Sequence, residues 1–126
     1  MALIIQTVEG VVSNKFEITE KPLIFGRSPK NQVQIDDLAV STEHAQILSE
    51  KDKDGREIFI LEDLGSTNGT FINEVRIEGK KQLHHNDGLR IGWNVFTFID
   101  ENEVDLEKTR EIKKSWIPGV YYTKDK

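Results

Sequence analysis

The chain has 126 residues, 37% of them hydrophobic and 31% charged, and a net charge of −5 at pH 7. This composition suits one soluble globular domain, the acidic balance disfavours non-specific nucleic-acid binding, and no apolar run reaches the roughly 20 residues that span a membrane. Cysteine is absent, which excludes disulfides, thiolate chemistry and sulfur-bound zinc; since no signal peptide precedes the first apolar run, we expect a cytoplasmic protein.

From Ala2 to about Asp100, short runs of β-branched and aromatic residues alternate with turn-forming residues. Turn signals about eight to twelve residues apart are typical of an all-β sandwich or barrel, and the strand–helix–strand rhythm of a parallel sheet is missing. The predicted strands span residues 2–8, 15–18, 23–26, 33–35, 44–50, 57–63, 70–72, 75–77, 82–83, 89–92 and 95–100. The strand over 57–63 has apolar residues on both faces, which predicts a central strand covered on both sides.

The character of the sequence changes after Asp100. Helix-forming residues follow, and a moderately apolar stripe at a spacing of three or four runs from Leu106 to Trp116, which predicts an amphipathic helix. Pro118-Gly119 ends the pattern. We therefore expect a folded domain over residues 1–100 and a helical extension or linker over residues 101–126.

Three connectors between predicted strands carry unusual polar residues. They contain Gly26-Arg27, then Ser41-Thr42-Glu43-His44, then Ser66-Thr67-Asn68-Gly69-Thr70. Each motif alone is common, but in this order and spacing they resemble the forkhead-associated (FHA) domain family over about residues 1–100. The resemblance implies an all-β sandwich of about eleven strands whose loops bind phosphothreonine peptides, and the number of strands predicted above agrees with it.

The residues of these connectors have the chemistry that a phosphate needs. A phosphothreonine carries about −1.5 to −2 charges and three strong acceptor oxygens. Arg27 offers a permanently charged planar fork for a bidentate contact, and Ser41 adds a hydroxyl donor. The resemblance implies that the hydroxyl of Thr67 faces the phosphate and that Asn68 binds the peptide main chain. Thr42, where the family often has Asn, is included as a further donor through its hydroxyl and backbone N–H.

Other motif residues are expected to support the loops without touching the ligand. The resemblance implies that Gly26 allows close packing or a special backbone angle, and that His44 ties loops together by hydrogen bonds. Gly69 forms a tight turn with the asparagine before it. Ala39 lies two residues before Ser41, where some family members have a basic side chain that selects an acidic peptide residue. An alanine here predicts an apolar or shape-based preference instead.

Catalytic and metal chemistry fit the sequence poorly. Ser41 and His44 are close in sequence, but no acid or oxyanion loop completes a triad, so no catalytic residue is assigned. His84 and His85 point to opposite faces if they lie on a strand, and the segment 52–55 lacks the spacing and closing Glu of a calcium loop. We therefore expect no metal site and no cofactor.

The sequence thus predicts a non-enzymatic, phosphothreonine-dependent interaction module in kinase-linked signalling. The alternative is an interaction or dimerisation module that works without phosphate. The expected partner is a phosphothreonine-containing protein, with no nucleic acid or membrane involved. The chain's own tail or a neighbouring copy is a further candidate, because Thr109 and Thr123 offer phosphorylation sites in the segment after the domain.

Overall fold

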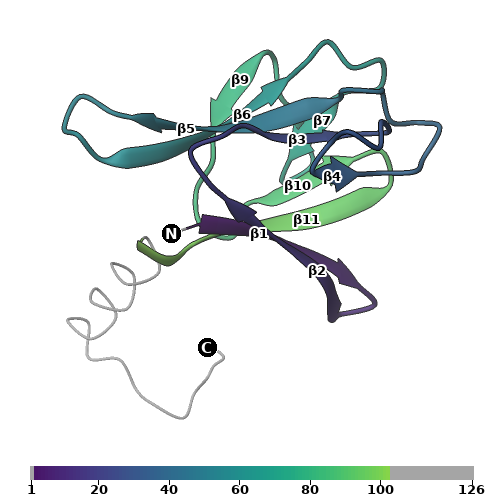
Figure 1. Cartoon of the computed structure of the whole chain (residues 1–126), viewed down its shortest axis with the longest axis horizontal. Coiled ribbons are helices and arrows are strands. Elements are labelled where there is room, and N and C mark those ends of the chain that lie inside the picture. Colours follow the sequence, from purple (N-terminus) through teal and green to yellow (C-terminus); the bar gives the residue numbers. More distant parts are fainter. Residues whose placement is uncertain (1, 103–126) are drawn as a thin grey trace.

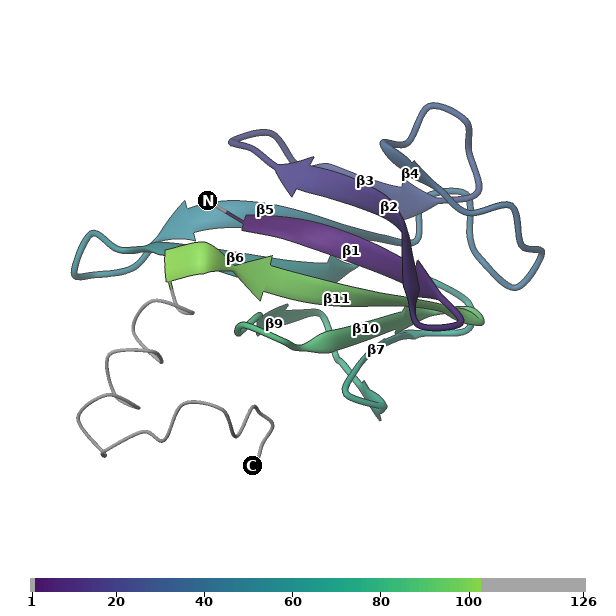
Figure 2. The ribbon, with the colours of Figure 1, turned by 90° about the horizontal axis from the view of Figure 1, so that it is seen from below.

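The computed structural model describes residues 2–102, which fold into a sandwich of two β-sheets (Figures 1 and 2). In chain order the strands are β1 (Ala2–Val8), β2 (Val11–Ile18), β3 (Leu23–Gly26), β4 (Val33–Gln34), β5 (Ala45–Lys51), β6 (Glu57–Asp63), β7 (Thr70–Ile72), β8 (Val75–Arg76), β9 (Lys80–Gln82), β10 (Gly88–Ile91) and β11 (Asn94–Asp100). This part of the chain therefore confirms the all-β sandwich of eleven strands.

The start of β2 differs most from its predicted position. Glu9 and Gly10 both have a positive φ, so they form a two-residue turn that places Val11 directly opposite Val8. The sequence pattern predicts a connector at Val11, whereas the tight turn lets strand pairing begin there. The expected helical extension over 101–126 lies outside the described residues except for its first two positions. No helix within residues 2–102 is long and apolar enough to cross a membrane.

Six strands form one sheet in the order β2-β1-β11-β10-β7-β8, and five form the other in the order β4-β3-β5-β6-β9. Neighbouring strands are antiparallel except for the parallel pair of β3 and β4. β1 pairs with β11, so that Ala2 lies opposite Asp100. The first and last strands therefore meet within one sheet.

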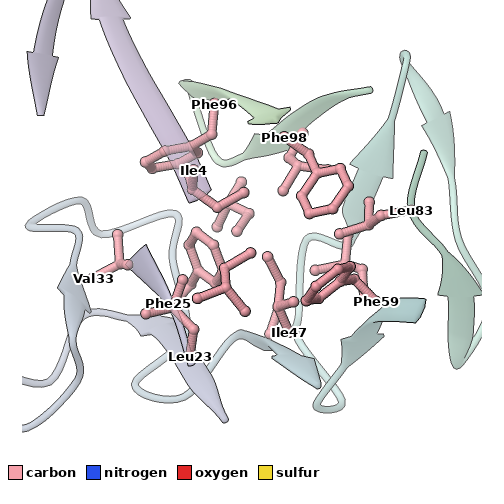
Figure 3. Packing of buried hydrophobic residues seen from close by; sticks show 14 of the residues in the cluster. Ile4, Leu23, Phe25, Val33, Ile47, Phe59, Leu83, Phe96 and Phe98 are labelled. Carbon is pink, nitrogen blue, oxygen red and sulfur yellow. The ribbon is translucent and has the colours of Figure 1, made fainter. Parts of the chain in front are cut away.

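The hydrophobic core lies between the two sheets (Figure 3). Phe25 meets Phe96 edge-on, with ring centroids 5.3 Å apart, and Phe59 packs on Phe98 at 5.4 Å. Both pairs join opposite sheets, which fixes how the sheets face each other. On β6, Phe59 is buried but Ile58 and its outer-face neighbours are only half-buried. The prediction that both faces of this strand are covered was therefore wrong, because no further layer packs on the outer face within residues 2–102.

The connectors are divided between the two ends of the sandwich. The β3–β4, β4–β5, β6–β7 and β10–β11 connectors lie at one end, on the right of Figure 1, and we call this the loop end. The tip of the β5–β6 hairpin lies at the other end, on the left of the same view. The strand order therefore brings the three sequence motifs, which are far apart along the chain, to the same end of the fold.

Candidate functional site

Close backbone packing at Gly26 joins the first two motifs. The N–H of Arg27 donates to the carbonyl of Ser41 at 3.0 Å, and the N–H of Ser28 donates to the carbonyl of Thr42 at 3.2 Å. A Cβ atom on Gly26 would lie 2.2 Å from that Thr42 oxygen, which is closer than any real Cβ contact. Glycine is needed here because another loop approaches the backbone closely, and not because of a positive φ.

Arg27 is exposed, yet one contact orients its side chain. Its Nε donates to the carbonyl oxygen of Val40 at 3.1 Å, beside the backbone bond to Ser41. Its terminal Nη atoms make no hydrogen bond or ion pair with any residue between 2 and 102. The guanidinium is thus fixed at its inner nitrogen and keeps its outer nitrogens available for an anion.

A direct hydrogen bond links the second and third motifs. The N–H of Thr67 donates to Oγ of Ser41 at 3.3 Å. A hydroxyl that accepts this bond still has its own proton to donate. The hydroxyls of Thr42 and Thr67 are exposed and make no hydrogen bond in the described part of the chain. The connectors therefore hold three hydroxyl donors beside the Arg27 fork.

His44 lies fully buried beneath these loops. Its Nδ1 accepts the N–H of Ser41 at 3.0 Å, and its Nε2 lies 2.8 Å from the carbonyl oxygen of Gly69. Because a backbone N–H can only donate, Nδ1 is the acceptor, which assigns the ring proton to Nε2 and makes Nε2 the donor to Gly69. The imidazole therefore connects the second loop to the third across 25 positions of sequence.

Asn68 reaches across the loop end to the backbone of the β4–β5 connector. Its Nδ2 donates to the carbonyl oxygen of Ala39 at 2.8 Å. Its Oδ1 makes no hydrogen bond within residues 2–102, so it can accept an N–H from a bound chain. The next residue, Gly69, has a φ of +90°, and a Cβ there would also lie 2.7 Å from Nε of Arg76. The backbone angle favours glycine after Asn68, whereas the exposed Arg76 side chain could turn away from an added Cβ.

Asp63, the last residue of β6, holds the third loop and was missed by the sequence analysis. Its Oδ2 accepts the N–H groups of Gly65 (3.0 Å) and Ser66 (3.1 Å), and its Oδ1 accepts the hydroxyls of Ser66 (2.5 Å) and Thr70 (2.7 Å). Burial raises the pKa of this carboxyl, but the four hydrogen bonds outweigh burial, so the pKa lies below its ordinary value of 3.8. An aspartate followed by glycine and serine is a turn signal that marks this position in the sequence.

Two further residues at the loop end were also missed. Asn31 is buried, and its Nδ2 donates to the carbonyl oxygen of Thr42 at 2.7 Å. Its partner lies eleven positions away, so no local pattern marks it. The exposed Arg76 of β8 lies over Gly69 and makes no hydrogen bond or ion pair with the described residues. It places a second guanidinium beside the third loop.

The loop end gathers hydrogen-bond donors: a guanidinium, hydroxyls and backbone N–H groups. The half-buried carboxylate of Asp63 already accepts four hydrogen bonds from its own loop. Within residues 2–102, no group of three or more His, Asp or Glu side chains is arranged to hold a metal ion. The arrangement therefore suits an anion.

The chain matches the family model of the FHA domain over residues 23–92, which is more than half of its length. It belongs to the FHA domain family. FhaB of Mycobacterium tuberculosis, which is described as FHA domain-containing, is 29% identical to it over 85 residues. That match covers 67% of this chain and 52% of FhaB, so this FHA chain spans about half the length of the curated relative.

Solved FHA structures share the fold. One, from a study of phosphothreonine-dependent FHA domain interactions, superposes with a TM-score of 0.66 and 27% identity, covering 80% of this chain and 98% of the other. EmbR of Mycobacterium tuberculosis, solved in complex with a low-affinity phosphopeptide, gives a TM-score of 0.66 and 26% identity, covering 78% of this chain and 24% of EmbR. The two similarities extend beyond the three motifs to most of the sandwich.

Proposed function

We propose that this FHA domain binds phosphothreonine-containing segments of partner proteins and serves as a protein–protein interaction module in kinase-linked signalling. The observation that carries the proposal is the direct linkage of Arg27, Ser41 and Thr67. They come from three connectors, are joined by hydrogen bonds between those connectors, and keep guanidinium or hydroxyl protons available. The phosphothreonine and phosphopeptide binding described for similar FHA proteins supports it.

Each proposed contact follows from the donors that remain. The Nη atoms of Arg27 take two phosphate oxygens in a charge-assisted, bidentate contact. The hydroxyls of Ser41 and Thr67 donate to the phosphate, and Thr42 adds its exposed hydroxyl and backbone N–H. Asn68, held at Ala39, accepts an N–H of the peptide backbone through Oδ1. Gly26, His44 and Gly69 keep these donors in place and do not touch the ligand.

Calorimetric titration with paired phosphothreonine and unmodified peptide libraries tests the proposal. We expect binding to require the phosphate, and Arg27→Ala to remove a charge-assisted contact of about 1.5–3 kcal/mol, which weakens binding by roughly 10- to 150-fold. Arg56→Ala is the matched control, because Arg56 is an exposed arginine on the hairpin at the opposite end. Equal binding of the unmodified peptides, or full binding by Arg27→Ala, would instead favour the phosphate-independent interaction module.

The proposal extends to the rest of the chain. The FHA family is one of interaction modules, and we propose that this chain likewise acts by binding and not by catalysis, in the cytoplasm, with neither nucleic acid nor membrane as partner. We propose a folded domain over 1–100 and a helical extension or linker over 101–126. A phosphorylated Thr109 or Thr123 is a candidate ligand for the same loops. Kinase treatment that leaves both the mass in light scattering and the peptide affinity unchanged would refute this self-recognition.

A further inference from the structure

The two sheets have four edge strands, and these differ greatly in length. β4 and β8 have two residues each and β9 has three, whereas β2 has eight. A very short edge strand offers few unpaired backbone groups, but a long one is a template on which another strand can pair. Within residues 2–102 no strand covers the outer edge of β2 (Figure 1), and most of its residues are exposed. β2 is therefore the edge at which a further strand can add.

A bulge limits how much of this edge is regular. The pairing of β2 with β1 shifts at Ser13, which is an extra residue without a partner on β1. A bulge bends its strand and increases the local twist, so it interrupts regular pairing. Residues 14–18 pair with β1 without a shift. The regular part of the edge is therefore centred on Phe16.

The side chains of this regular segment fall into two sets. Ile18 is buried and Phe16 is partly buried against the core, so both lie on the inner face of the sheet. Lys15 and Glu17 alternate with them, and they therefore lie together on the outer face, where both are exposed. Neither side chain makes a hydrogen bond or ion pair within residues 2–102. The outer face of β2 thus carries one positive and one negative charge, two positions apart and without protein partners.

This pattern is complementary to itself. When two copies of β2 pair antiparallel around Phe16, Lys15 of each copy lies opposite Glu17 of the other, and the two Phe16 residues face each other. Residues opposite each other on antiparallel strands have Cβ atoms about 4.5–5.5 Å apart, which favours opposite charges and aromatic pairs. Moving the centre by one residue would place like charges opposite each other, which is destabilising. The charges therefore favour one register of a symmetric pair.

We propose that β2 pairs antiparallel with β2 of a second copy of this chain, centred on Phe16, so that the six-stranded sheets of the two copies continue into each other. Opposite charges two positions apart suit an identical strand better than an unrelated one. The contact is small, so it belongs with weak, transient interfaces and forms at high protein concentration. The pairing uses no phosphate, so it goes beyond the proposed function and does not depend on it.

The proposed pairing determines where the two phosphate sites lie. β1 starts opposite Asp100, at the end of β11 that is far from the loop end, so the turn from β1 into β2 lies toward the loop end. β2 therefore runs away from the loop end, and an antiparallel partner runs toward its own. The loop ends of the two copies then lie at opposite ends of the pair. Such a pair binds two separate phosphothreonine segments, which raises its avidity for partners that display several of them.

Charge reversal tests the pairing through exposed residues. The parent full chain, Lys15→Glu and Glu17→Lys are compared by sedimentation velocity from micromolar to millimolar concentration. We expect the parent to associate as its concentration rises and each variant to associate at least about tenfold more weakly, because attraction becomes repulsion at two symmetric positions. An equimolar mixture of the two variants should associate like the parent, since the carboxylates of one variant then face the ammonium groups of the other.

Lys53→Glu is the matched control, because it makes the same change of charge at an exposed position on the β5–β6 hairpin. It should associate like the parent, and equal urea midpoints for all variants verify that the fold is unchanged. A parent chain that stays monomeric at millimolar concentration overturns the proposal and leaves the edge free or covered by residues 103–126. Association that survives either reversal, or that mixing does not restore, also overturns it and assigns the contact to another surface.

A separate measurement distinguishes this inference from the proposed function. Calorimetric titration of the same variants with a phosphothreonine peptide, at micromolar concentration where the chain is monomeric, should give the affinity of the parent, because Lys15 and Glu17 lie outside the three connectors. Loss of phosphate-dependent binding in the parent would contradict the proposed function and leave the pairing of β2 intact. Loss of binding in Lys15→Glu or Glu17→Lys alone would overturn the inference, because it would assign these charges to the peptide site.

Discussion

The two ends of the sandwich close their turns in different ways. At the tip of the β5–β6 hairpin, Oδ1 of Asp52 accepts the N–H groups of Asp54 and Arg56, each at 2.9 Å, so the turn is satisfied within five residues. At the loop end, the bonds from His44 to Gly69 and from Thr67 to Ser41 cross 25 and 26 positions of sequence. One end closes on itself, and the other is cross-linked between loops.

This difference shows what a binding site built from loops requires. A hairpin tip needs only local geometry, so a change there stays local. Donors that must meet one phosphate from three loops need fixed positions relative to each other, because misplaced donors bind a shared ligand weakly. Two polar side chains provide that fixing here: the buried His44 between the second and third loops, and the half-buried Asp63 within the third. The predictions that follow compare the loop end with the hairpin tip.

The largest expected effect is that of His44→Ala. It leaves the N–H of Ser41 and the carbonyl of Gly69 without their partner in a buried site and creates a cavity, so we expect a loss of about 3–4 kcal/mol in the free energy of unfolding. Asp52→Ala, which removes the hydrogen-bonded side chain of the hairpin tip, should cost only about 1 kcal/mol. Urea unfolding measures both, and equal losses would contradict the proposed cross-linking role of His44.

Gly26→Ala should have the next largest effect. The added methyl carbon would lie 2.2 Å from a backbone oxygen, which cannot turn away as a flexible side chain can. We expect a loss of about 2–3 kcal/mol in stability, together with weaker phosphopeptide binding because the second loop must shift. Gly88→Ala is the control: its nearest neighbour, Oδ1 of Asn73, is at an ordinary 3.5 Å. Unchanged stability in Gly26→Ala would show that the loops can move apart freely.

Asp63→Asn should destabilise the fold less, by about 2 kcal/mol at neutral pH. The carboxylate has two acceptor oxygens for its four donors, whereas the amide keeps only one acceptor oxygen. Asp54→Asn at the hairpin tip is the control, since that side chain accepts no hydrogen bond from residues 2–102. The comparison is read from urea midpoints of the two variants beside the parent chain. Equal midpoints for Asp63→Asn and Asp54→Asn would show that the third loop does not depend on this carboxylate.

Acidic pH should remove the stabilisation that the Asp63 carboxylate provides. Because the folded pKa of Asp63 lies below the ordinary 3.8, its stabilisation is complete above that value and is lost as the pH falls through the lower, folded pKa. The stability difference between the parent chain and Asp63→Asn should therefore be constant from neutral pH to about pH 5 and shrink below about pH 3.8. A difference that stays constant into strong acid would contradict the assigned hydrogen bonds.

The fold was largely predictable because strands and tight turns leave local patterns. Alternating apolar residues located β6 and β7 at their observed bounds, and the count of eleven strands was confirmed. The predictions were wrong where a local pattern had two interpretations. The valines after Gly10 fit a connector as well as a hairpin. The alternating isoleucines on β6 fit a covered face as well as the half-buried face that the structure shows.

The site could be predicted only as far as its motifs extend. The residues proposed to contact the ligand, such as Arg27 and Thr67, lie within short motifs with recognisable spacing. The residues that hold the loops in place do not lie in such motifs. Asn31 and Asp63 act through hydrogen bonds that can be recognised only once the fold has brought their partners together.

Amide chemical shifts of the labelled chain, recorded during titration with a phosphothreonine peptide, test the central claim most directly. The largest changes should fall on residues 27–28, 41–42 and 66–69, with none at the hairpin tip over 52–56, and the unmodified peptide should cause no such changes. Shifts in all three loops would show that one phosphate contacts donors from all of them. Shifts centred on the hairpin tip, or the same shifts with the unmodified peptide, would contradict the account.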